Sequence, residues 1–212
     1  QNGQTVRSFL REIEALIFDP TYKAKRVNQA AGQDLILTSA NNYYEGVTQA
    51  EVERFYADMK AKDNSSEPIS YGLNSRLVKK DGELYEEVYK IGGRYSAAIE
   101  KIVENLKMAE KYSESEQQRG HIAKLIQYYT DGNLKTFDEY SILWVEDVVS
   151  SVDFINGFIE SYGDPLGYKG AWESIVNFKD LEATERTKKL SENAQWFEDH
   201  SPVDKRFKKE KV

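Results

Sequence analysis

The chain has 212 residues and a formal net charge of −7, because 36 acidic residues outnumber 29 basic ones. This balance argues against a nucleic-acid partner, since phosphate binding needs a basic surface. Cysteine is absent, which excludes disulfides and thiolate metal sites. No apolar stretch has the length of a membrane helix, so we expect no membrane partner.

The sequence shows neither a targeting signal nor a metal motif. No signal peptide is recognisable and the chain starts with Gln1 rather than Met, so the localisation stays open. The lack of cysteine suits the cytoplasm, and a periplasmic location is the alternative. The two histidines, His121 and His200, lie far apart in the sequence. A self-contained zinc site needs three or four ligands, so we predict no metal ligand here and place His121 on the surface of a polar helix.

The first part of the chain predicts two helices separated by an extended piece. Apolar residues at helical spacing predict a helix over 5–18, with a threonine as its N-cap. The run at 35–48 predicts a strand or extended piece followed by a loop. Thr48 and Glu51 form the pattern of a capping box, which predicts that a second helix begins there.

A hairpin and three long helices are predicted next. Asp81 and Gly82 stand between two alternating runs, which is typical of a hairpin near 76–89. Three helical patterns follow, at 95–112, 114–132 and 134–148. Their apolar stripes indicate a shared core.

The last part of the chain predicts two strands and a helix. Residues 149–165 carry apolar side chains at both parities, which favours a strand buried on both faces. A second strand is predicted at 171–178 after a glycine-bounded turn. A helix at about 182–198 and a charged tail complete the chain.

The predicted fold class is α+β, predominantly α-helical, with helices packed around a small partial β element. We expect a single fragment over 1–212, divided into a mainly helical part (1–148), a strand-rich cleft segment (149–180) and a helix with a charged tail (181–212). The few predicted strands are not enough for a complete sheet of ordinary size. We therefore expect partner strands from outside this segment.

Three side chains near the predicted turn carry the candidate chemistry. Residues two apart on a strand point to the same face, so Glu160 and Tyr162 are predicted to project together. A carboxylate there can receive an ammonium group, and a tyrosine hydroxyl can donate to an oxyanion. Glu173 could face the same space. The alternative is structural: Glu160 pairs with an arginine, and the Tyr162 hydroxyl lies in water. Spacing alone favours this alternative.

The run GFIESYGDPLGYKGAWES at 157–174 resembles the dipeptidyl peptidase III family, in which G-F-I-E-S-Y-x-D-P-x-G precedes a glutamate-bearing strand. The resemblance extends over essentially the whole chain. It also includes the segments NSRL, DGELYEEVY, IEKIVENLKMAEKY, FDEYSILWVED and NAQWFEDHSPVDKRFKKEKV, which are similar to bacterial members.

This resemblance implies a zinc-dependent exopeptidase that releases N-terminal dipeptides from short peptides. It implies that Glu160 holds the substrate's amino group, that Tyr162 stabilises the tetrahedral oxyanion, and that Glu173 lines the cleft. Asp164, and the proline and glycine that follow it, match the family's turn.

The family's zinc motif, His-Glu-x-x-x-His, is missing from this sequence. We therefore expect an internal fragment that supplies a substrate-binding wall and is inactive alone, while the remainder of its own polypeptide holds the zinc. Two alternatives stay open: a non-catalytic peptide-binding relative and a purely structural helical domain.

Overall fold

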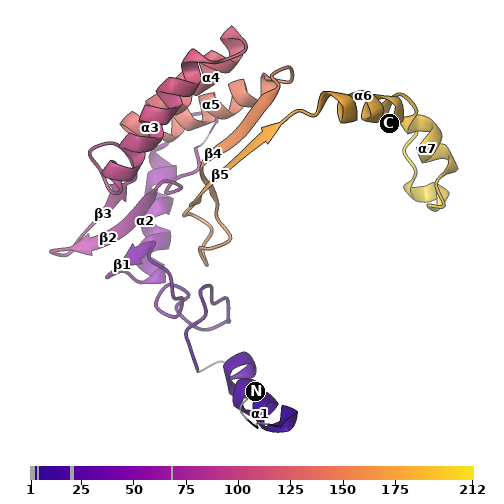
Figure 1. Cartoon of the computed structure of the whole chain (residues 1–212). Coiled ribbons are helices and arrows are strands. Elements are labelled where there is room, and N and C mark those ends of the chain that lie inside the picture. The colour runs from indigo at the N-terminus through magenta and orange to yellow at the C-terminus, as the bar shows by residue number, and fades with distance from the viewer. Residues whose placement is uncertain (1–2, 4, 20–21, 68) are drawn as a thin grey trace.

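This computed structural model describes residues 3, 5–19, 22–67 and 69–212. Figure 1 shows a central body, with α1 (Val6–Phe18) apart from it at the N-terminal end and an arm at the C-terminal end. The further elements are β1 Tyr44–Glu45, α2 Gln49–Lys62, β2 Ser75–Lys80, β3 Glu83–Val88, α3 Ser96–Lys111, α4 Glu116–Asp131, α5 Leu134–Glu146, β4 Val152–Glu160, β5 Ala171–Phe178, α6 Leu181–Glu192, α7 Ala194–His200 and a 3-10 turn at Lys205–Phe207. None of the described helices has both the length and the apolar character needed to cross a membrane.

Helix α1 begins where the sequence predicts it. Oγ1 of Thr5 accepts the N–H of Ser8 at 3.2 Å and satisfies one free donor of the first turn. No described side chain of α1 is buried, and the helix stands away from the central body (Figure 1). Its apolar residues are therefore exposed, Phe9 to 50% and Ile17 to 63%.

Residues 35–39 form turns, so the predicted strand at this place is wrong. The carboxylate of Asp34 accepts the N–H groups of Ile36 and Leu37, each at 2.9 Å. Its second oxygen accepts the N–H of Gln49, also at 2.9 Å. These local bonds compete with sheet pairing, and the extended piece is confined to the two residues of β1.

The capping box and the first hairpin are confirmed. Thr48 and Glu51 exchange hydrogen bonds at the start of α2. Strands β2 and β3 pair antiparallel and turn at Asp81 and Gly82, which both have positive φ (53° and 87°). Strand β1 adds parallel to β2. Helix α2 and this sheet share a core formed by Ile36, Val47, Val52, Tyr56 and Leu77.

The three predicted long helices are confirmed as α3, α4 and α5, which lie together on one side of the body (Figure 1). Their apolar stripes meet in a single core, as the sequence predicts. The buried members are Tyr89, Ile99, Val103, Leu106, Ile122, Leu125, Tyr128, Tyr129, Phe137, Tyr140 and Phe158. Phe158 belongs to β4, so the second sheet packs on this helical core.

Strands β4 and β5 form the second predicted hairpin, which confirms the α+β, predominantly helical class. The prediction that strand β4 is buried on both faces is wrong for the described chain. In β4 only Gly157 and Phe158 are fully buried, while Ile175 and Val176 of β5 are 50% and 55% exposed. Ile175 and Val176 are consecutive and point to opposite faces, so β5 is incompletely covered on both of its faces. The need for strands from outside this segment stays a prediction.

The helix predicted at 182–198 is divided into α6 and α7. The break lies at Asn193, whose Nδ2 donates to the carbonyl of Lys189 at 2.8 Å. Asparagine bonds of this kind compete with helical pairing, so one helix ends and another begins at this residue.

Gly170 is predicted to be intolerant of a side chain. A Cβ there would lie 2.9 Å from the backbone carbon of Phe158 and 3.0 Å from the carbonyl oxygen of Leu73. Because backbone atoms do not yield, Gly170→Ala should lower the free energy of unfolding by about 1–3 kcal/mol in chemical denaturation. Gly120→Ala on α4 is the control: nothing lies within 4 Å of its Cβ position, and the change should stabilise by up to about 1 kcal/mol. Equal effects would contradict the close approach.

Candidate functional site

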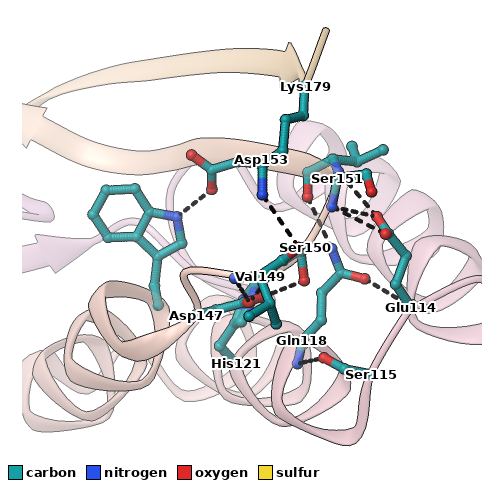
Figure 2. Close-up of polar contacts among 12 residues, drawn as sticks. Glu114, Ser115, Gln118, His121, Asp147, Val149, Ser150, Ser151, Asp153 and Lys179 are labelled. Atoms are coloured by element: carbon teal, nitrogen blue, oxygen red, sulfur yellow. Dashed lines mark hydrogen bonds and ion pairs between the residues drawn. The ribbon is translucent and has the colours of Figure 1, made fainter. Parts of the chain in front are cut away.

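The base of the β4–β5 hairpin is fixed by the start of α4 (Figure 2). The carboxylate of Glu114 accepts the N–H groups of Ser151 at 3.0 Å and Val152 at 2.9 Å. These backbone bonds lower the pKa of Glu114. Nε2 of Gln118 donates to the carbonyl of Val152 at 2.9 Å. Strand β4 therefore leaves the helical body in a defined register.

His121 lies in the core below this anchor, so its predicted surface position is wrong. It is 2% exposed, and its Nε2 lies 3.3 Å from Oδ2 of Asp147, which also accepts the Ser150 hydroxyl at 2.6 Å (Figure 2). Burial lowers the pKa of His121 although Asp147 opposes the shift. The spacing of His121 from Leu125 on one helical face is the sequence signal that indicates its burial.

The tip of the hairpin carries Glu160. Strand β4 ends at this residue, which pairs with Ala171 after a register shift that begins at Phe158. The side chain of Glu160 is half-buried, and it makes no hydrogen bond or ion pair with another described residue. The expected alternative, a pair with an arginine of the fold, is therefore not seen in the described chain.

Tyr162 lies beyond the strand, in the turn. The premise that it shares a strand face with Glu160 is wrong because strand β4 ends at Glu160 and Tyr162 already lies in the turn. Tyr162 is 71% exposed, and its hydroxyl donates to Oε1 of Glu173 at 3.5 Å. The structure thus brings Tyr162 and Glu173 together at one side of the turn. No hydrogen bond joins Glu160 to either of them among the described residues.

The turn itself is organised by Asp164, which is 3% exposed. Its carboxylate accepts the N–H groups of Leu166 (3.1 Å), Tyr168 (2.8 Å) and Lys169 (3.0 Å), and the hydroxyl of Tyr44 (2.6 Å). Four donors on one carboxylate fix the path of the chain between β4 and β5.

An aromatic cavity of about 480 Å³ opens beside Ala171, the residue paired with Glu160. Its lining includes Tyr43, Tyr89, Tyr95, Phe158 and Trp172. Sequence reasoning missed this cavity because the rings come from distant segments and no short motif marks them. A cavity of this kind suits an apolar side chain.

The described residues do not fit a zinc site. In that part of the chain no three histidine, cysteine, aspartate or glutamate side chains form a group that could hold a metal ion. His121 is bound to Asp147, and Nδ1 of His200 lies 2.7 Å from the carbonyl oxygen of Trp196.

Comparison with known proteins places the chain in a family. The model of Peptidase family M49 matches residues 27–212. The chain belongs to peptidase family M49. Dipeptidyl peptidase 3 of Dictyostelium discoideum is 35% identical over 131 residues, which are 62% of this chain and 18% of that protein. Dipeptidyl peptidase 3 of Homo sapiens is 29% identical over 119 residues, 56% of this chain and 16% of that protein.

Solved structures of the family share the fold of this M49 chain. DPP III from Caldithrix abyssi matches with a TM-score of 0.61 at 15% identity, over 98% of this chain and 38% of that one. Dipeptidyl-peptidase III from Corallococcus sp. strain EGB matches with a TM-score of 0.54 at 20% identity, over 79% of this chain and 30% of that one. The chain spans less than a fifth of the length of the two curated relatives described above.

Because His121 is buried, we predict that the folding stability of the chain depends on pH. Its pKa is lowered in the folded state from an ordinary value of 6.5, so the unfolded chain binds the proton more tightly. The contribution of neutral His121 to the folding stability should be fully present above pH 6.5. It should be lost as the pH drops through the pKa of the folded state. The check is the unfolding temperature as a function of pH.

The control for this measurement is a variant that lacks the imidazole. His121→Gln should flatten the pH profile just below pH 6.5, where the ordinary imidazole titrates. An unchanged profile in His121→Gln would contradict the account.

Proposed function

We propose that this chain is part of a zinc-dependent dipeptidyl peptidase that releases N-terminal dipeptides from short peptides, and that it supplies the substrate-binding wall. Membership of family M49 supports the reaction class. The observation that carries the role of this segment is Glu160, a half-buried carboxylate without a partner among the described residues, at the tip of an anchored hairpin.

Glu160 holds the free ammonium group of the peptide. An ionised carboxylate attracts an ammonium strongly when both are partly removed from water. Because β4 fixes Glu160 relative to the turn, the distance from the amino terminus to the reacting carbonyl is fixed as well. That distance selects cleavage after the second residue.

Tyr162 donates its hydroxyl to the oxyanion that forms on the reacting carbonyl. The side chain is exposed, so a substrate can reach it, and Glu173 orients it in the absence of substrate. In the complex the hydroxyl turns from Glu173 to the oxyanion. The cavity beside Ala171 accepts an apolar side chain of the peptide.

Zinc, in this proposal, is held by the remainder of the same polypeptide. When bound, it supplies an activated water for hydrolysis. The chain alone therefore binds short peptides without cleaving them. This binding property separates the proposal from a purely structural helical domain.

Tyr162→Phe is predicted to reduce kcat of the intact peptidase by about 10²–10³-fold, as the loss of one oxyanion donor does. KM should change little because the bond forms mainly in the transition state. Steady-state kinetics on a dipeptidyl substrate provide the measurement. An unchanged kcat would remove Tyr162 from the mechanism.

Glu160→Gln is predicted to lower kcat/KM for peptides with a free amino terminus by about 10- to 100-fold, because a charge-assisted bond is lost. N-acetylated peptides, which carry no ammonium, should be equally poor substrates of both proteins. Glu185→Gln on the exposed surface of α6 is the matched control and should have no effect. Equal losses for free and acetylated peptides would refute the anchor role.

A further inference from the structure

Lys169 is a fully buried cation at the end of the turn that carries Tyr162. Its exposed fraction is 0%. Nζ donates to the hydroxyl of Tyr56 and to Oγ of Ser75 (2.9 Å), and it lies 3.5 Å from Oε1 of Glu86. These acceptors belong to α2, β2 and β3. The side chain of Lys169 therefore connects the tip of the β4–β5 hairpin to helix α2 and to two strands of the first sheet.

Aromatic rings complete the surroundings of this ammonium group. Nζ lies 4.8 Å from the ring centroid of Tyr56 and 5.7 Å from that of Tyr44. Tyr168, the residue before Lys169, stacks on Tyr56 with centroids 4.5 Å apart. The charged and titratable groups around Lys169 are therefore Tyr44, Tyr56, Glu86, Asp164 and Tyr168.

Two hydrogen bonds within the turn connect Lys169 to the loop that carries Tyr162. The N–H of Lys169 donates to the carboxylate of Asp164 at 3.0 Å. The N–H of Asp164 donates to the carbonyl of Ser161 at 3.0 Å, which closes a small loop around Tyr162 and its neighbour Gly163. A shift of Lys169 would therefore move Asp164 and, with it, the loop that presents the Tyr162 hydroxyl.

Burial disfavours the charged form of Lys169. Burial lowers the pKa of Lys169 from 10.5 to about 8, against the opposing effect of Glu86. Between those two values the unfolded chain binds more protons, so stability rises with pH there and the charged form is unfavourable in the core.

We propose that Lys169 is a positioning residue that holds the turn 161–170, and thereby the Tyr162 hydroxyl, in the geometry needed for oxyanion stabilisation. This inference rests on the proposed function of Tyr162. Lys169 does not touch the substrate, since it is buried behind the turn. It acts through Asp164 and the loop that Asp164 closes.

The first test measures the turn directly, in the chain itself, by hydrogen–deuterium exchange. Removing only the cation leaves the half-buried Glu86 with one donor fewer, so the test variant is the charge-balanced pair Lys169→Met with Glu86→Gln. Exchange at Asp164 and Tyr168 should rise about tenfold, while α4 stays protected. Lys188→Met, an exposed lysine of α6, is the control and should change nothing. Unchanged exchange in the turn would overturn the proposal.

The second test is a double-mutant cycle in the intact peptidase. The charge-balanced pair should lower kcat about tenfold or more with little change in KM, as a small misplacement of a reacting group does. In a Tyr162→Phe background the pair should have no further effect, because the positioned hydroxyl is gone. An equal loss in both backgrounds would overturn the proposal. If Tyr162→Phe alone left kcat unchanged, the proposed function of Tyr162 would fail, and the exchange result would still show whether Lys169 holds the turn.

Discussion

The carboxylate of Asp164 is the contact on which the candidate site depends. It binds three backbone N–H groups of its own turn and the hydroxyl of Tyr44 from the first sheet. The turn would otherwise be a flexible connection between two strands, since ten residues separate β4 from β5. Because Asp164 fixes the turn against the body, the side chains on either side of it have defined positions. A site for a small peptide requires such preorganised groups.

The hairpin that carries this turn is stabilised from its two ends and from one face. Glu114 and Gln118 hold the base, Asp164 and Lys169 hold the tip, and Phe158 packs into the helical core. An isolated two-stranded hairpin is at best marginally stable in water, so these contacts are needed to keep it in place. Strand β5 stays partly uncovered on both faces, since Ile175 and Val176, which point to opposite faces, are both about half exposed. We propose that strands from the remainder of the polypeptide cover it.

The sequence predicted elements well where local signals are strong. The capping box at Thr48, the Asp81-Gly82 turn and the apolar stripes of α3 to α5 all gave elements that the structure confirms. It failed where side chains act on the backbone from a short distance. Asp34 replaced a predicted strand by turns, and Asn193 divided a predicted helix. These competing bonds carry no periodicity, so pattern analysis does not detect them.

The residues of the candidate site stay a prediction, and their geometry could not be read from the sequence. Glu160, Tyr162 and Glu173 were proposed from the resemblance, whereas the end of β4 at Glu160, which places Tyr162 in the turn, was not foreseen. Lys169 gave no signal at all, because a lysine between aromatic and glycine residues reads as a surface residue. Its burial follows from contacts with Tyr56, Ser75 and Glu86, which lie about 80 to 110 residues away in sequence.

The most direct test of the central claim is a crystal structure of the intact peptidase with a non-cleavable tetrapeptide bound. The account predicts that the peptide's ammonium nitrogen lies within about 2.7–3.2 Å of the Glu160 carboxylate, with the second carbonyl group facing Tyr162. A peptide whose amino terminus is bound by other residues, with Glu160 left in solvent, would contradict it.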